Sequence, residues 1–298
     1  MPSFSPAALK TYRAHTYFFA PGQRLASADE AVEFVNRRGF VYFWPIKDVE
    51  LPSLWVAAAG DRPVADAHDD PGHVTWAWKD SLLGQRRWYY ARVLKRRNAM
   101  LSLAVLPYFY VLSSNFGDPE NDYLEQYLQG TLTAESKALY ECLLTEGPLD
   151  TIALRKAAHL SGPASDGRFT KALDDLQMGF KVLPVGISPA GAWRYAFIYD
   201  LTHRQYPDLI EQAGAIYESN ARQQLALLYL QSVGAVPLAQ VARLFAWKNA
   251  ETEKYLKPLL TSGQLVTAAF PDQPHLSASR PVEGWVGLPQ LLEHSSEE

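Results

Sequence analysis

Cysteine is almost missing from this sequence of 298 residues, in which Cys142 is the only one. A single thiol excludes a disulfide within the chain and a zinc site built from several cysteines. Long apolar runs are also missing, and the first residues, MPSFSPAALK, have no apolar core of the kind that a signal peptide needs. We therefore expect a cytoplasmic protein that does not enter the membrane.

Signatures of nucleotide binding and of common hydrolases are missing as well. No stretch has the pattern Gly-x-Gly-x-x-Gly, a phosphate-binding loop or a nucleophile elbow. The loop with His68, Asp69, Asp70 and His73 could bind a cation, but its composition is more typical of a polar surface loop. We expect neither a resident metal nor a cofactor.

The overall charge is slightly acidic, with a net charge of −4 and a pI near 6.0, which disfavours a protein that coats nucleic acid without specificity. One stretch departs from this balance, because the chain has six basic residues and no acid between Gln85 and Arg97. At 100° per residue, Trp88 shares one side of a helix with three of these cations. We expect a basic helix within Trp78–Arg97 that binds DNA phosphates and stacks a base on its tryptophan. A solvated helix whose tryptophan covers a neighbouring domain is the alternative. The candidate DNA-binding residues of this stretch are Arg86, Arg87, Trp88, Arg92, Lys95 and Arg96.

One pattern occurs twice in the second half of the chain. The segments ALDDLQMGFKVLPV (Ala172–Val185) and YLKPLLTSGQLVTA (Tyr255–Ala268) each predict a helix, a glycine that closes it in the left-handed conformation, and a short strand. Two further helical patterns precede each copy, and three helices followed by a hairpin is the order of a winged helix. These patterns are Ala134–Thr145, Leu149–Leu160, Ser219–Ser232 and Leu238–Ala246.

The predicted hairpin is complete in the first copy, where Lys181–Ile187 and Trp193–Asp200 flank the turn residues SPAG. In the second copy a single strand, Gln264–Phe270, precedes Pro271, so we expect a short or absent wing. Pro258 counts against the third helix of that copy, because proline removes a helical hydrogen bond. A pair of helical packing modules without a ligand is the alternative for both copies.

The third helix of a helix-turn-helix enters the major groove, with its first turns nearest the bases. In the first copy this helix is predicted at Asp166–Met178. Arg168 and Lys171 lie near its start and are candidate DNA contacts, as is Arg194 in the predicted wing. A solvated helix face would carry similar charges. The stripe expected to be buried consists of Phe169, Leu173 and Leu176.

The run GFVYFWPIKDVELPSLW, at Gly39–Trp55, contains five aromatic side chains and three charges. It fits a buried strand, and it also fits the wall of a pocket. Together with WAWKDSLL at Trp76–Leu83, it predicts an aromatic cleft suited to stacking on a base. The residues expected to line this cleft are Tyr42, Trp44, Trp76 and Trp78.

Taken in order, these two aromatic runs, the basic stretch and the two winged-helix copies resemble the bacterial winged-helix DNA glycosylases of the AlkZ/YcaQ type. The resemblance extends roughly from Ser27 to Phe270. It implies a mainly α fold with small β hairpins, made of tandem winged helices that form a concave DNA-binding face. It also implies double-stranded DNA as the partner, and repair of alkylated or crosslinked bases as the activity.

The sequence departs from this family at the catalytic motif. Members have Gln-x-Gln or Gln-x-Asp in the first winged helix, where the polar pair places water against the sugar as the glycosidic bond breaks. The corresponding stretch, Phe40–Ile46, has no glutamine and no acid, and the WAWKD run lacks the histidine that members can show after Trp-Ala. Asp48 is the nearest carboxylate and stays a reserve catalytic candidate; pairing with a surface arginine is the alternative. We expect excision of simple methylated bases to be absent or very weak.

Four domains are predicted along the chain. They are an aromatic-rich, winged-helix-like domain with the basic helix at 1–130, a second winged helix at 131–207, a third at 208–272 and a C-terminal extension at 273–298. Part of the extension is expected to pack back on the body through Trp285, Val286 and Leu288.

Two functions from different classes fit these predictions. The first is a DNA-binding protein of the glycosylase family that has lost catalysis or moved it to other residues. The second is a winged-helix transcription regulator, or a sensor whose aromatic cleft holds a small molecule. A regulator usually needs dimer symmetry to bind two half-sites. The chain has no heptad run that demands a partner, so we expect a monomer.

Overall fold

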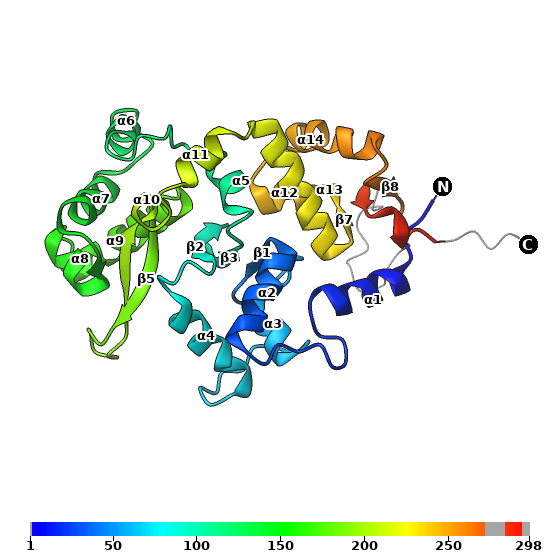
Figure 1. Ribbon diagram of the computed structural model, residues 1–298, viewed down its shortest axis with the longest axis horizontal. Coiled ribbons are helices and arrows are strands. Elements are labelled where there is room, and N and C mark those ends of the chain that lie inside the picture. The colour runs from blue at the N-terminus through cyan, green and yellow to red at the C-terminus, as the bar shows by residue number, and fades with distance from the viewer. Residues whose placement is uncertain (1, 272–283, 294–298) are drawn as a thin grey trace, which may run out of the picture. The chain divides into compact units, whose positions relative to one another are not determined.

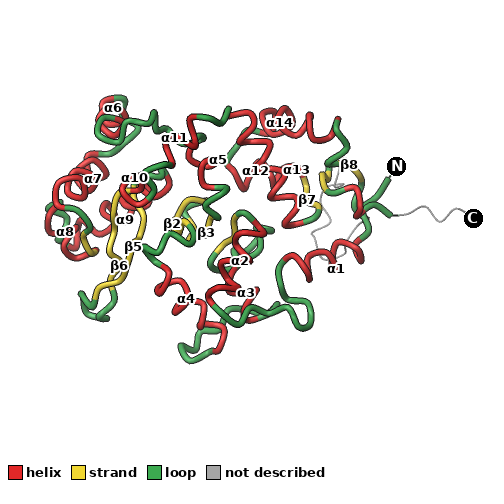
Figure 2. The backbone as a smooth tube through the Cα atoms, viewed as in Figure 1, coloured by secondary structure: helices red, strands yellow, loops and turns green. Residues whose placement is uncertain are grey.

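The computed structural model describes residues 2–271 and 284–293 of the chain. These residues are mainly helical, with small antiparallel sheets, as Figures 1 and 2 show. The chain divides into two compact units, one made of Met1–Thr75 with Arg222–Glu298 and the other of Trp76–Ala221. The predicted fold class, mainly α with small β hairpins, is confirmed. No helix in the described ranges is long and apolar enough to cross a membrane.

One half of the unit Trp76–Ala221 consists of three helices and a three-stranded antiparallel sheet. In this sheet β6 lies between β4 and β5. The core beneath the helices is apolar, with Leu139, Leu154, Leu176 and Leu201 fully buried. The elements are α7 (Ala134–Glu146), β4 (Leu149–Asp150), α8 (Thr151–Ala157), η2 (Pro163–Ser165), α9 (Asp166–Met178), β5 (Val182–Ser188) and β6 (Ala196–Leu201).

Polar side chains fix where two of these helices begin. The Thr133 hydroxyl accepts a hydrogen bond from the Ser136 amide at the start of α7, at 3.1 Å. The Asp150 carboxylate accepts from the amides of Ile152 and Ala153 at the start of α8, both at 2.9 Å. Such caps satisfy amides that have no partner inside the helix. Asp150 is therefore both the last residue of strand β4 and the N-cap of helix α8.

The rest of this unit contains a hairpin of β2 (Tyr89–Leu94) and β3 (Arg97–Leu101) with several short helices. The ring of Phe180, just after α9, lies 5.5 Å from the ring of Tyr89 and 6.3 Å from that of Phe109. These aromatic contacts join the hairpin to the helix–sheet half. The short helices are α4 (Val74–Leu82), α5 (Leu106–Tyr110), α6 (Asp122–Leu128), α10 (Thr202–Gln205) and α11 (Leu209–Gly214).

The C-terminal part of the other unit has the same order of elements. Its sheet places β9 between β7 and β8, as β6 lies between β4 and β5. Two stretches of the chain therefore fold into the same topology, which agrees with the repeat in the sequence. The elements are α12 (Glu218–Val233), β7 (Ala235–Pro237), α13 (Leu238–Phe245), α14 (Asn249–Thr261), β8 (Val266–Ala268), β9 (Trp285–Gly287) and η3 (Pro289–Leu291).

The N-terminal part of this unit begins with α1, in which the guanidinium of Arg13 donates to the carbonyls of Val233 and Ala235, both at 2.9 Å. From α2 onward the chain again has the order helix, strand, helix, helix, strand, strand, ending with α4, β2 and β3. The first elements are α1 (Pro6–Thr16), α2 (Ala28–Arg38), β1 (Phe40–Tyr42), α3 (Leu54–Ala59) and η1 (Pro71–His73).

Three details of the repeat differ from the prediction. Gly263 has the left-handed φ of +73°, but Gly179 has φ −81° and Phe180 takes the left-handed position instead, at φ 54°. Pro258 lies inside α14 without ending the helix. One strand, with a short or absent wing, was expected before Pro271; the structure also has β7 before it and β9 after it, and β9 pairs with both β7 and β8.

Of the predicted C-terminal extension, 273–283 and 294–298 lie outside the described residues. In the described part, the expectation that it packs on the body is confirmed. Trp285, Val286 and Leu288 are all buried. The stacked ring of Phe270 lies 4.1 Å from that of Trp285, so this tryptophan is part of the core of its unit.

Candidate nucleic-acid interface

Helix α9 spans Asp166–Met178, as predicted from its apolar spacing. Its stripe of Phe169, Leu173 and Leu176 is buried in the core of the helix–sheet half. Arg168 and Lys171 lie outside that stripe, and the side chain of each is more than half exposed. The first two turns of α9 therefore present cations to solvent.

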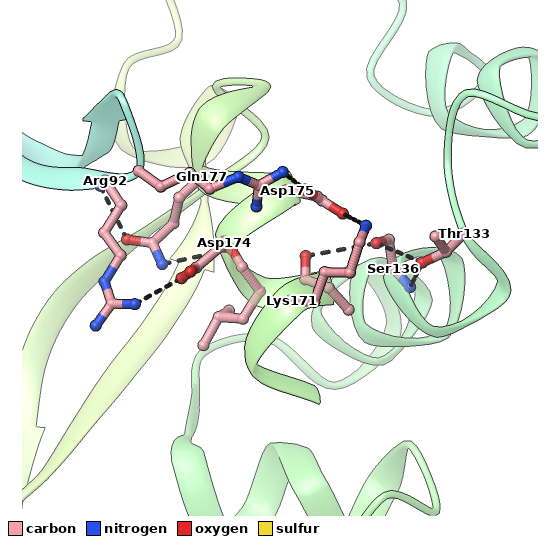
Figure 3. Close-up of polar contacts among 10 residues, drawn as sticks. Arg92, Thr133, Ser136, Lys171, Asp174, Asp175 and Gln177 are labelled. Carbon is pink, nitrogen blue, oxygen red and sulfur yellow. Dashed lines mark hydrogen bonds and ion pairs between the residues drawn. The ribbon is translucent and has the colours of Figure 1, made fainter. Parts of the chain in front are cut away.

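The C-terminal half of α9 has a different environment, because strand β2 covers it. The guanidinium of Arg92 donates to the Asp174 carboxylate at 2.8 Å, and the Arg92 amide donates to the Gln177 side chain at 3.2 Å (Figure 3). Asp174 and Gln177 point from the helix toward the strand in this view. The hairpin thus closes one end of α9 and leaves the other end open.

One carboxylate in this region has two cationic partners. Asp175 accepts from Arg96 at 2.5 Å and from Lys171 at 2.6 Å. Together with the Arg92–Asp174 pair, three cations meet two carboxylates, so one positive charge is in excess. The two pairs of Asp175 are exposed, and exposed ion pairs are worth about 0–1 kcal/mol each, so these two pairs can open at small cost.

The basic helix predicted within Trp78–Arg97 was wrong. Only its first residues are helical, in α4, and Tyr89–Leu94 and Arg97–Leu101 form the antiparallel pair β2–β3. The turn between the strands has two left-handed residues, Lys95 at φ 51° and Arg96 at φ 57°, as a type I′ turn requires. Strand β2 has buried side chains on both faces, so its sequence lacks the alternation that indicates a strand.

This change of element separates the candidate residues that a helix would have placed together. Trp88 is buried and not available for stacking on a base, which corrects the expectation that it is exposed. Arg92 lies in the strand, while Lys95 and Arg96 form the turn at its end. The acid that the stretch itself lacks is supplied by α9, through Asp174 and Asp175. The remaining exposed cations of the stretch are Arg86 and Arg87, on the loop before β2, and Arg97, at the start of β3.

Two other predicted DNA contacts, Arg168 and Arg194, are exposed to solvent. Arg168 forms an ion pair with Glu135 at 3.2 Å, although its side chain remains largely exposed. Arg194 is exposed in the turn between β5 and β6, and has a left-handed φ of 51°. Neither residue is removed from solvent, so both stay candidates.

The residues predicted to line an aromatic cleft are mostly core residues. Tyr42 is fully buried in β1 and Trp78 is buried in α4, so neither has a surface to offer a base, which corrects their assignment. Trp44 is partly buried and packs on Trp55 and His73, with ring centroids 6.1 Å and 5.7 Å away. Trp76 is the exposed member of the set, at 42%. The run at Gly39–Trp55 is therefore mainly a buried strand with its packing partners.

Asp48, the reserve catalytic candidate, is exposed and has a left-handed φ of 60°. Within the described ranges no arginine or lysine pairs with it, so the expected surface pair is not found. Phe40–Phe43 before it are buried and apolar. A solvated carboxylate in a turn lacks the apolar surroundings that would adapt it to general acid–base work.

The loop with His68, Asp69, Asp70 and His73 contains an ion pair between Arg62 and Asp70. Arg62 donates to both carboxylate oxygens of Asp70, at 3.0 Å and 2.6 Å, and Asp70 also accepts from the Gly72 amide. Burial does not dominate here: the hydrogen bonds from Arg62 lower the pKa of Asp70. The described residues contain no group of three or more His, Cys, Asp or Glu placed to hold a metal ion.

Sequence reasoning missed a buried lysine that fixes the base of the β5–β6 hairpin. The ammonium of Lys79 lies 4.6 Å from the ring centroid of Phe197 and 5.5 Å from that of Tyr90, and it donates to the Tyr195 hydroxyl at 3.0 Å. Asp80 neutralises it and accepts from Tyr195 at 2.9 Å. The sequence shows Lys79 and Asp80 as an ordinary charged pair, and only the fold brings aromatic rings around them.

A second buried lysine lines a small polar pocket in the same unit. Lys181 donates to the Asn115 side chain at 2.6 Å, and burial lowers the pKa of Lys181 to about 8, against the opposing effect of Asp122. The pocket, which His203 also lines, has a volume of about 10 Å³. That is room for one water molecule, so the pocket cannot admit a nucleobase.

Comparison with solved structures gives the class of fold. The chain is similar to the Streptomyces sahachiroi DNA glycosylase AlkZ, with a TM-score of 0.57 over 97% of this chain and 71% of that chain. The sequence identity is 12%, so the likeness shows the fold alone.

Sequence comparison then gives the family. A family model described as AlkZ related matches residues 25–246, which is well over half of the chain. The protein therefore belongs to the AlkZ-related family, as the order of its motifs predicted. None of the curated proteins matches the chain in sequence.

Proposed function

We propose that this protein binds double-stranded DNA through tandem winged helices and acts on damaged DNA, as a relative of the glycosylases for alkylated or crosslinked bases. The observation that carries the proposal is the open first half of α9, which presents Arg168 and Lys171 at the turns that a recognition helix places nearest the bases. Family membership gives the relation to glycosylases.

The element order supports the assignment of winged helices. In α7 to β6 and in α12 to β9, three helices and three strands follow one another as in a winged helix, with the last strand in the centre of the sheet. The order in α2 to β3 is the same along the chain. Under this proposal β5 and β6 form the wing of the second winged helix, and Arg194 is a wing residue.

The charges around α9 support DNA over an apolar ligand. One positive charge is in excess among Arg92, Arg96 and Lys171, and the exposed pairs of Arg96 and Lys171 with Asp175 can open toward a phosphate. The burial of Tyr42 and Trp78 removes the aromatic cleft on which the small-molecule sensor rested. We propose that the protein works as a monomer; sedimentation as a stable dimer would favour the transcription regulator instead.

Catalysis is a separate part of the proposal. The stretch that holds the polar pair in relatives is Phe43-Trp44-Pro45-Ile46 here, and none of these side chains can accept a proton or orient water. Proline also removes a backbone donor at this position. We therefore propose that excision of simple methylated bases is absent or very weak, and that any catalysis depends on other residues.

A binding experiment tests the first part. Fluorescence anisotropy with a labelled duplex should give a salt-dependent affinity, and the double variant Arg168→Ala/Lys171→Ala should bind more weakly with a salt slope smaller by about 2. The matched control removes two exposed cations outside the proposed surface, Lys10→Ala/Arg37→Ala. Equal behaviour of the two double variants would reject α9 as a contact surface.

A second experiment tests excision. Duplex DNA with methylated or crosslinked purines is incubated with the protein and then heated in alkali, which breaks the strand at each abasic site. Robust strand breakage by the native protein would contradict the proposed lack of activity on simple methylated bases. Breakage confined to crosslinked purines would identify the lesion class.

A further inference from the structure

The hairpin of β5 and β6 ends in a short turn that holds the most exposed large hydrophobic side chain in the described part of the protein. Trp193 is 92% exposed, whereas most tryptophans in the described ranges are buried or partly buried. The hairpin runs past helices α7 and α8 of its unit to this turn, as Figure 1 shows. Exposing an indole so fully forgoes the apolar burial that it would otherwise contribute.

The turn is ordered by hydrogen bonds, so the position of Trp193 is set by the backbone. The Arg194 amide donates to the Gly191 carbonyl at 3.0 Å. The Ser188 hydroxyl donates to Asp150 at 3.1 Å and accepts from the Ala190 amide at 3.1 Å. Below the turn, Tyr195 is held by Lys79 and Asp80. A hydrogen-bonded turn with an exposed aromatic tip is suited to contact a partner with little further ordering of its backbone.

The charge of the turn indicates the kind of partner. From Pro189 to Tyr195 the chain has one charged residue, Arg194, and no carboxylate. An indole beside a guanidinium matches a nucleobase beside a phosphate, since the ring stacks on the base and the cation pairs with the backbone. Nucleic acids present flat rings and anions at a regular spacing, which favours DNA over a protein or a lipid surface as the partner.

We infer that Trp193 stacks on a base in DNA whose own stacking is disrupted, so that the β5–β6 turn selects distorted duplex over intact duplex. Inserting an aromatic side chain into intact DNA requires a base step to unstack, which costs energy. At a bulge, a mismatch or a damaged base the bases are already unstacked, so stacking of Trp193 on a base adds to the affinity without that energy loss. The inference rests on the proposed DNA-binding function and assigns it a substrate class, namely duplex DNA with an unstacked base.

Affinity measurements on two duplexes test it. The duplexes have the same sequence, but one contains a single unpaired base. Trp193→Ala should lower affinity for the bulged duplex by about tenfold or more and change affinity for the intact duplex by less than about twofold. Trp193→Phe, which keeps a ring, should retain most of the preference. Circular dichroism checks that both variants fold.

The outcomes separate this inference from the proposed function. Native protein that binds both duplexes, with no selective loss in Trp193→Ala, would overturn the inference and leave DNA binding intact. Native protein that binds neither duplex would overturn both. If the native protein self-associates and Trp193→Ala abolishes this, the inference is overturned. The partner of Trp193 would then be a second copy of the chain. Fluorescence gives an independent readout. The emission of Trp193 is the native spectrum minus the Trp193→Phe spectrum, and the bulged duplex should quench this emission.

Discussion

Replacing Lys181 with methionine should remove a contribution that makes the free energy of unfolding of the native protein rise with pH above about 8. Lys181 is 6% exposed, and burial lowers its pKa to about 8, whereas a lysine in an unfolded chain has a pKa of about 10.4. Below pH 8 both states bind the proton, so the cost of burying the ammonium is fully present. As the pH rises toward 10.4, the folded state loses the proton first and that cost disappears.

The size of the effect follows from the two pKa values. The gap corresponds to roughly 3 kcal/mol in total, of which about 2 kcal/mol should appear between pH 7.5 and 9.5. Stability of the native protein should therefore rise by about that amount relative to Lys181→Met over this range. The buried tyrosines titrate in both proteins alike, so their contribution cancels in the difference.

Urea unfolding at a series of pH values measures this difference directly. Lys156→Met, which removes an exposed lysine from α8 in the same unit, is the matched control for loss of a positive charge. The native curve should rise relative to Lys181→Met and run parallel to Lys156→Met. Parallel curves for native protein and Lys181→Met would refute the reasoning, because the lysine would then have the same pKa in both states.

Three further predictions concern single side chains. Asp175→Ala should strengthen DNA binding and steepen its salt dependence in anisotropy titrations, because it releases Arg96 and Lys171 from their shared carboxylate. Gly84→Ala should lower the free energy of unfolding, measured in urea, by more than about 1 kcal/mol, since Gly84 has φ +72° and a Cβ would lie 2.6 Å from the Val185 carbonyl oxygen. Asp48→Asn should leave excision of crosslinked purines unchanged in the alkali assay; lost excision would move catalysis to Asp48.

The sequence predicted α9 well because two signals agree there. Its apolar residues repeat at helical spacing, and Pro163 and Gly162 before it break the preceding helix. Strand β2 was misinterpreted for the opposite reason. Both of its faces are buried, so it has no alternation, and its cations happen to fall at helical spacing.

The candidate site shows a similar division. The exposed cations of α9 could be predicted, since they lie outside a clear apolar stripe. The ion pairs between the hairpin and the helix could not be predicted, because Arg92 and Asp174 are far apart in sequence and meet only through packing. Strand β9 was missed because the strands it pairs with, β7 and β8, lie well before it in the sequence, and three residues give too little pattern to identify a strand.

The carboxylate of Asp175 has a consequence for how fast this protein could search DNA. It lies between Arg96 and Lys171, where a phosphate would bind, and so acts as a resident competitor for the same two cations. If this surface binds DNA as proposed, each phosphate contact would displace an internal partner, which would lower the net gain of binding at undamaged sites. Weak, readily exchanged contacts shorten the dwell time at each position and favour sliding along the duplex. Under the proposed function, the acid would thus limit nonspecific affinity while both cations stay at the surface.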